Sequence, residues 1–359
     1  MNPYENLPQK SFWKLAVGTV KPLEVDQLWS PKFNLTESDK FVTYGSCFAQ
    51  HIGRALKARG FNWTDVEPAP YGLSDANKKV FNYGVFSSRT GNIYTSTLLR
   101  QWTRWACGLD LVPDEVWEQD GRFYDPFRPA IEPNGFASVE EMRDSQRFAI
   151  ASFKESIEIC DYFVFTMGLT ESWFHSVHGY EYPMCPGTIA GEFVEGSHIF
   201  LNQDYAQVNK ALIETIELMK SMNPNIKFIV TVSPVPLTAT KSGNHVLTAT
   251  TYSKSVLRAV AGHLSSTIEC VDYFPSYEII TAPVFGGQFY EENRRGVTTK
   301  GVSFVMDSFF KCLSGIKPQQ PRIQTTEVKE LTKPDQQSAQ DLLNCEEAVL
   351  DAFAQGARQ

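Results

Sequence analysis

The 359-residue chain is 42% hydrophobic and 21% charged, which is the composition of a globular protein with a buried core. Its 33 basic and 41 acidic side chains give a net charge of −8, and this excess of acid argues against nucleic acid as a partner. The seven cysteines are scattered and form no C-x-x-C pair, which argues against a disulfide framework and a structural zinc site. No signal peptide or apolar membrane-spanning run is apparent, so we expect a reduced cytoplasmic setting without a membrane span.

The first clear element is a strand over residues 41–44, which stops at Gly45 and Ser46. A helical pattern follows directly, with Gly60 as its C-cap and apolar residues at Phe48, Ile52, Ala55 and Leu56. The sequence therefore predicts a strand–turn–helix unit with a serine in the turn.

Helices and strands then alternate along the chain. Ser138-x-x-Glu141 is a capping box that opens the next helix. The predicted helix–strand pairs are 138–159 with 162–167, 205–222 with 226–232, and 252–264 with 268–273. The strand over 162–167 is apolar, as strands buried on both faces are, and the strand over 226–232 is also expected to be buried. This order predicts an α/β fold, a three-layer α/β/α sandwich with a mainly parallel central sheet.

Two segments interrupt the alternation, at 110–135 and 179–200, and both are rich in proline, glycine and aromatic residues. The first contains a hairpin turn at Gln119-Asp120-Gly121-Arg122. We interpret both segments as insertions in one α/β domain that spans 1–320. Residues 321–359 are expected to form a polar linker and a terminal helix over 342–353, which either packs on its own domain or docks within a larger assembly.

Ser46 is the most informative residue in the chain. It follows a strand and opens a helix, so its side chain is expected at the carboxyl edge of the sheet, where backbone N–H groups of the first helical turn can bind an oxyanion. Gly45 permits a close approach of the backbone to a substrate. The alternative interpretation is that Ser46 is only an N-cap.

Several stretches resemble a known family. Gly45-Ser46-Cys47-Phe48-Ala49 is the signature of the GSCFA domain family. The resemblance covers about residues 2 to 310 and includes Asn2–Pro8, Gly91–Thr95, Gly168–Trp173, Thr231–Leu237, Tyr252–Arg258 and Tyr273–Glu278. This family in turn resembles the SGNH, or GDSL-type, hydrolases, which have a flavodoxin-like fold and act on esters of lipids and carbohydrates.

The resemblance implies a role for each matching residue. Ser46 would be the nucleophile, and its N–H together with that of Gly91, beside Asn92, would hold the oxyanion. Gly168 opens the third block, in which Thr170 stands where the SGNH-type pattern has an asparagine, and the Thr170 hydroxyl can donate one hydrogen bond. Glu171 follows and either contributes to the site or is simply a solvated or paired carboxylate.

The late Asp-x-x-His block that the resemblance implies lacks both its acid and its base in this chain. Asn293 and Gly296 stand at the acid and base positions, and no histidine follows His263. A serine hydroxyl is a weak nucleophile without a base. The remaining candidates for that base lie in loops at the carboxyl edge of the sheet, namely His175, His178 and His245. Glu278 is a further candidate base or substrate-binding group, or it pairs with a loop arginine.

These observations predict a serine-dependent acyl-ester hydrolase or O-acyltransferase whose substrate is a carbohydrate or another acylated small molecule. Aromatic residues of the insertions offer stacking surfaces for sugars, namely Phe123, Tyr124, Trp173, Tyr180 and Tyr182. The alternative is a catalytically degenerate module that binds a glycan or a partner protein. Neither a nucleotide-binding glycine motif nor metal-ligand spacing is present, so no cofactor and no metal are expected. The oligomeric state and the choice between hydrolysis and transfer stay open.

Overall fold

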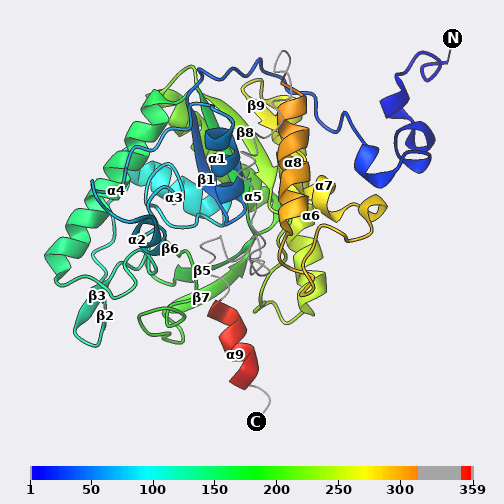
Figure 1. The fold of residues 1–359 in the computed structure, drawn as a ribbon. Helices are drawn as coiled ribbons and strands as arrows, with labels where there is room; N and C mark the ends of the chain where they lie inside the picture. Colours follow the sequence, from blue (N-terminus) through cyan, green and yellow to red (C-terminus); the bar gives the residue numbers. More distant parts are fainter. Residues whose placement is uncertain (1, 314–348, 357–359) are drawn as a thin grey trace, which may run out of the picture. The chain divides into compact units, whose positions relative to one another are not determined.

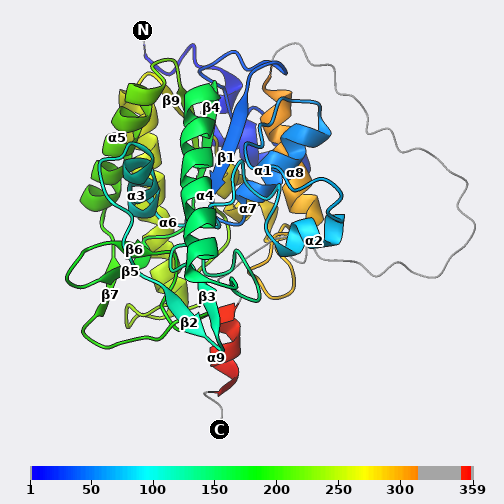
Figure 2. The same ribbon diagram turned by 90° about the vertical axis from the view of Figure 1, so that its left-hand side faces the viewer.

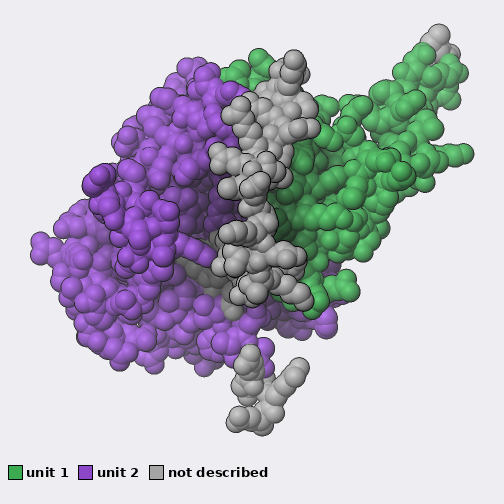
Figure 3. Space-filling view, in the orientation of Figure 1, with its two compact units in different colours: residues 1–36, 274–342 green, residues 37–273, 343–359 purple. Residues whose placement is uncertain are grey.

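The computed structural model describes residues 2–313 and 349–356. The chain divides into two compact units (Figure 3). The larger one, here called the sheet unit, comprises the described residues within 37–273 and 343–359. The smaller one, here called the helical unit, comprises those within 1–36 and 274–342.

The centre of the sheet unit is a four-stranded parallel sheet (Figure 1). Its order is β1-β4-β8-β9, with bounds Phe41–Gly45, Tyr162–Met167, Lys227–Val232 and Val271–Tyr273. Trp63 forms an isolated parallel bridge with Phe41, so it occupies a fifth position in the sheet order, next to β1 on the side away from β4. Counted in chain order, the five positions follow the 2-1-3-4-5 arrangement of doubly wound sheets, so the direction of winding reverses between β1 and β4.

Helices cover both faces of this sheet. α1 (Ala49–Ala58) leads from β1 toward the Trp63 position, whereas α5 (Tyr205–Met222) and α6 (Val246–Thr267) lead from β4 to β8 and from β8 to β9. Right-handed crossovers that run in opposite directions place their helices on opposite faces. Figure 2 shows α1 on one side of the sheet and α5 and α6 on the other. The expected three-layer α/β/α sandwich is therefore confirmed.

The element boundaries agree closely with the sequence pattern. α4 spans Val139–Ile159, and the Ser138 hydroxyl caps it by accepting from the Glu141 N–H at 3.1 Å. The Glu141 carboxylate accepts from the Ala137 N–H rather than from that of Ser138, so the capping box is only half formed. α6 begins six residues before the expected Tyr252, and β9 is confined to three residues.

Both insertions contain antiparallel strands. The hairpin turn at 119–122 joins β2 (Trp117–Gln119) to β3 (Arg122–Tyr124), and Asp120 and Gly121 both have positive φ, as a tight hairpin turn requires. In the second insertion β6 (Glu181–Tyr182) and β7 (His198–Asn202) pair with opposite edges of β5 (Glu171–His175). This small sheet therefore begins just beyond the end of β4.

Aromatic rings pack the interior of the sheet unit. Phe41 and Tyr162, which are direct partners in the β1–β4 ladder, stack with ring centroids 5.0 Å apart. Tyr44 stacks on Phe163 at 5.3 Å and meets Phe153 of α4 edge-on at 5.0 Å. These contacts hold α4 against the sheet through rings from three elements. α3 (Ser96–Ala106) and α2 (Asp75–Val80) complete the helices between β1 and α4.

The helical unit has its own aromatic core. Trp29 stacks on Phe309 at 5.0 Å, and Phe274 meets both rings edge-on. The unit contains α7 (Ser276–Thr281), α8 (Thr299–Lys311) and four short turns of helix, namely η1 (Gln9–Ser11), η2 (Lys14–Gly18), η3 (Pro22–Glu24) and η4 (Pro283–Phe285).

Only part of the expected C-terminal region is described. α9 spans Asp351–Gly356 and belongs to the sheet unit. It overlaps the last three residues of the terminal helix that was expected over 342–353. The expected polar linker lies largely outside the described residues. Among the helices that are described, none is both long and apolar enough to cross a membrane. The described cysteines form no disulfide with one another.

Candidate active site around Ser46

Ser46 lies at the carboxyl end of β1, beside the position where the winding of the sheet reverses. Ligands of doubly wound sheets bind outside the carboxyl ends of the strands at such a switch point. The side chain of Ser46 is buried, with 3% exposure. Its carbonyl accepts from the Ala49 N–H at 2.9 Å, so Ser46 is joined to the first turn of α1.

Two glycines let the backbone close around Ser46. Gly45 has φ of +130°, and a Cβ there would lie 2.3 Å from the Thr166 carbonyl oxygen. A Cβ at Gly168 would lie 3.1 Å from the Cβ of Ser46 and 3.0 Å from the Tyr94 carbonyl oxygen. A side chain at Gly45 would therefore force the ends of β1 and β4 apart, whereas one at Gly168 would require Tyr94 and Ser46 to shift by a few tenths of an ångström.

The N–H of Ser46 is hydrogen-bonded within the protein, whereas its hydroxyl is not. Its N–H donates to the Thr166 carbonyl at 3.0 Å as part of the β1–β4 ladder. It therefore does not point to an oxyanion in this structure, contrary to the role inferred from the resemblance. Among the residues that the structure describes, none hydrogen-bonds the buried Ser46 hydroxyl. A buried hydroxyl without a partner is unfavourable, because it has given up its bonds to water.

The loop that carries Gly91 and Asn92 does reach the end of β1. The Ile93 N–H donates to the Gly45 carbonyl at 3.0 Å, which fixes the loop one residue from Ser46. Asn92 is buried, with 4% exposure. Tyr94 then turns toward β4, and its carbonyl accepts from the Gly168 N–H at 2.9 Å and the Leu169 N–H at 3.2 Å. The three sequence blocks at Gly45, Gly91 and Gly168 are thus brought together.

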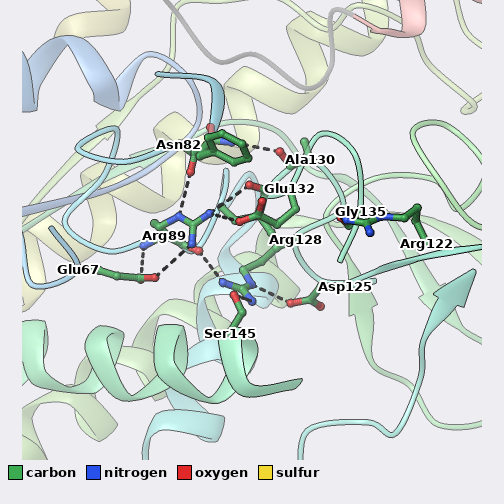
Figure 4. Close-up of polar contacts among 12 residues, drawn as sticks. Glu67, Asn82, Arg89, Arg122, Asp125, Arg128, Ala130, Glu132, Gly135 and Ser145 are labelled. Atoms are coloured by element: carbon green, nitrogen blue, oxygen red, sulfur yellow. Dashed lines mark hydrogen bonds and ion pairs between the residues drawn. The ribbon is translucent and has the colours of Figure 1, made fainter. Parts of the chain in front are cut away.

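A buried network of charges anchors this loop (Figure 4). Arg89 lies two residues before Gly91; its N–H donates to Glu67 at 2.7 Å and its guanidinium to Glu132 at 2.7 Å. Arg128 donates to the Arg89 carbonyl at 3.2 Å and to Asp125 at 2.7 Å. The side chains of Arg128 and Asp125 are completely buried. No local sequence pattern predicts this network, because its members lie far apart in the chain.

Both the backbone N–H and the hydroxyl of Thr170 are hydrogen-bonded to other residues. Its N–H donates to the Ser253 hydroxyl at 3.0 Å, and its own hydroxyl donates to Asn202 Oδ1 at 2.7 Å. The hydroxyl that was expected to serve an oxyanion hole is therefore committed to a protein partner. Glu171 beside it is half-buried and accepts from the Thr240 hydroxyl at 2.5 Å. Burial raises the pKa of the Glu171 carboxyl, and the hydrogen bond from Thr240 opposes that rise.

Lys254 was missed by the sequence analysis. It is buried on α6, and its Nζ donates to the Gly168 carbonyl at 2.5 Å. The signal is present in the sequence, since Lys254 shares a helical face with Leu257, Ala261 and Leu264, where an apolar residue is the rule. Together with Ser253 it connects α6 to the segment that follows β4.

The histidine candidates have local roles. His245 is exposed and caps α6, with Nδ1 accepting from the Leu247 N–H at 3.2 Å. His175 Nδ1 accepts from the N–H groups of Val177 and His178 at 3.2 Å. His175 and His178 line a cavity of about 1010 Å³ with Tyr180, which is a different cavity from the one beside Tyr94 and Leu169. The structure therefore supplies no contact that joins these imidazoles to Ser46.

His51 on α1 is the histidine nearest to Ser46 in the sequence. It is 6% exposed, and its ring lies edge-on to Phe48 at 5.4 Å. Burial, reinforced by the charge of Arg54, lowers the pKa of His51 to about 3, so the ring is neutral at physiological pH. None of the described residues hydrogen-bonds its Nε2.

The late block belongs to the helical unit, as does the half-buried Glu278 of α7. Asn293 Oδ1 accepts from the N–H groups of Arg295 and Gly296, both at 2.9 Å, which makes residues 293–296 a tight turn. The asparagine therefore has a structural use at the position where the resemblance to SGNH-type hydrolases implied an acid. In the part of the chain that the structure describes, no cluster of three His, Cys, Asp or Glu side chains could hold a metal ion.

The arrangement defines a class of protein, an α/β/α sandwich with a buried serine at the switch point of its sheet. The sequence profile of the GSCFA family matches residues 40–309, which is most of the chain. The chain therefore belongs to the GSCFA family, as its motifs had indicated. Comparisons with curated proteins and with solved structures find no match.

Proposed function

We propose that this protein is a serine-dependent acyl-ester hydrolase or O-acyltransferase that acts on a carbohydrate-type substrate, with Ser46 as the nucleophile. The observation that carries the proposal is the Ser46 hydroxyl itself. It is buried at the carboxyl edge of the sheet, and no described residue satisfies it. Other buried hydroxyls, such as those of Thr64, Ser96 and Thr166, also have no partner among the described residues, and Ser46 differs from them by its position at the end of β1 beside the switch point of the sheet.

The two glycines support the same proposal. Gly45 allows the close approach of β1 to Thr166, and Gly168 leaves out a Cβ that would lie 3.1 Å from the Cβ of Ser46. The loop at Gly91 and Asn92 reaches the same point and is fixed by buried charges. Preorganised backbone around a nucleophile is what acyl transfer needs, because donors must be in place before charge develops on the substrate oxygen.

A non-catalytic binding module is the second candidate, and the late block favours it. The turn at Asn293 and Gly296 provides neither an acid nor a base. The Thr170 hydroxyl and the Ser46 N–H are both engaged within the protein. In such a module the site around Ser46 would bind a glycan without cleaving an ester.

Covalent labelling separates the two functions. The full-length protein is treated with a fluorophosphonate probe, and the adduct is mapped by mass spectrometry alongside Ser46→Ala and a heat-denatured sample. An adduct on Ser46 that is absent from both controls supports the enzyme. If a known serine esterase is labelled in parallel and this protein is not, the binding module is favoured, and screening against acetylated and unacetylated oligosaccharides follows.

A further inference from the structure

An apolar cavity of about 310 Å³ lies in the sheet unit beside the Ser46 site. Its wall includes Tyr94 and Leu169. The ring of Tyr94 and the Cβ of Ser46 both lie within 3.2 Å of the place where a Gly168 side chain would be. Leu169 follows Gly168 directly, so the cavity begins one residue from the contact with Ser46.

The walls of this cavity are chiefly apolar. Leu169 and Leu237 are almost fully buried and belong to one hydrophobic cluster with Tyr94. The remaining apolar wall is formed by Trp173, Pro183, Met184, Phe200, Ala239, Leu350 and Phe353. Leu350 and Phe353 come from the segment that contains α9, and the cavity persists with that segment in place.

The polar residues at the cavity are largely engaged with one another. Glu171 accepts from the Thr240 hydroxyl at 2.5 Å and from the Lys241 N–H at 3.4 Å. A sugar ring needs many free donors and acceptors around it, whereas a hydrocarbon chain needs none. The cavity is about twice the size of the ~150 Å³ apolar cavity known to accept benzene. It is therefore too large for an acetyl group alone.

We propose that this cavity binds the acyl chain of the substrate, and that the chain is a medium-length hydrocarbon rather than acetyl. The proposal rests on the proposed function for the identity of the reaction, but binding of the chain is a property of the cavity alone. The carbohydrate or other acceptor would then lie outside the cavity, with the ester carbonyl at Ser46.

Direct binding tests the cavity without catalysis. Ser46→Ala protein is titrated with 11-(dansylamino)undecanoic acid, and saturable fluorescence enhancement is expected. Ala239 is exposed at the cavity wall, so Ala239→Trp fills the cavity without disturbing the core. This variant should weaken binding at least tenfold, whereas Ala151→Trp, at an exposed position on α4, should leave it within twofold. Circular dichroism verifies that each variant is folded. Ala239→Asp is the second variant at the same position, and it should also weaken binding because it places a charge at the apolar wall.

Ester hydrolysis by otherwise wild-type protein provides the second measurement. Each buried methylene strengthens binding roughly fourfold, so kcat/KM for p-nitrophenyl octanoate should exceed that for the acetate at least tenfold. Ala239→Trp should abolish this preference, whereas Ala151→Trp should retain it with both rates within twofold of the wild type. Turnover without chain-length preference and without undecanoate binding overturns the cavity proposal and keeps the enzyme. Undecanoate binding that Ala239→Trp abolishes, without turnover of either ester, keeps the cavity and rejects the enzyme. Binding of methyl glycosides in place of the fatty acid also overturns the proposal.

Discussion

Two buried polar regions of the sheet unit differ in whether their polar groups have hydrogen-bond partners. In the network around Arg89 and Arg128, each buried charge has several partners. At Ser46 the buried hydroxyl has no partner among the described residues. The first region shows what burial normally demands, since polar groups taken out of water are bonded to the protein. The second departs from that rule at the carboxyl edge of the sheet, which is where a ligand would supply the missing bond.

Breaking the network should have the largest effect. Arg128→Met leaves Asp125 buried without its cation and should lower the free energy of unfolding by about 3–5 kcal/mol. Arg147→Met is the control, because the Arg147–Asp144 pair is exposed and should contribute less than about 1 kcal/mol. Urea denaturation of both variants measures the difference. Equal losses would mean that burial of the pair contributes nothing.

Glu181 offers an intermediate case, a buried carboxyl with partners on one oxygen only. Thr95 and Ser172 donate to Oε1, whereas Oε2 has no partner among the described residues. Burial raises the pKa of Glu181 from 4.5 to about 7, and the hydroxyls oppose that rise. Between pH 4.5 and 7 the native state therefore holds a proton that the unfolded state has lost, so stability falls as pH rises through this window.

Glu181→Gln should remove that fall. The stability of the variant relative to the wild type should increase by about 3 kcal/mol from pH 4.5 to pH 8. The relative value is the correct measure, because burial of neutral His51 makes stability rise with pH between about 3 and 6.5. Urea denaturation at each pH measures it, with Glu118→Gln on the exposed end of β2 as control. A difference that does not vary with pH would contradict the assignment.

The smallest effect should come from the site itself. Ser46→Ala removes a buried hydroxyl that has no partner, so stability should stay within about 0.5 kcal/mol or increase. Ser156→Ala is the matched variant, because its buried hydroxyl accepts from Tyr44 at 2.8 Å and donates to the Phe153 carbonyl at 2.7 Å. That variant should lose about 1–3 kcal/mol. If both cost the same, the Ser46 hydroxyl has a partner in solution and the contrast disappears.

The sequence predicted those elements that carry their own local signals. The helix over 139–159 and the strand over 162–167 agree with expectation, because a cap, an apolar stripe and an apolar run are visible in one window of sequence. α6 was predicted too short at its start because His245 caps it, and histidine is not among the usual N-cap residues. β9 spans only Val271–Tyr273 of the strand expected over 268–273.

The site was predicted in part. The blocks at Gly45, Gly91 and Gly168 meet as their positions after strands and in loops suggested. The roles of individual atoms did not follow, because the Ser46 N–H is used by the β1–β4 ladder and the Thr170 hydroxyl by Asn202. Those partners are residues 120 and 32 positions away, so no local pattern reveals them.

By itself the sequence determined the family, the alternation of strands and helices, and the serine at the end of β1. These features depend on residue type and spacing along one stretch of chain. Only the tertiary structure decided that Ser46 is buried without a described partner, that Lys254 bonds to the Gly168 carbonyl, and that an apolar cavity begins at Leu169. Burial, hydrogen-bond partners and empty space depend on segments distant in sequence, and they exist only once those segments are packed together.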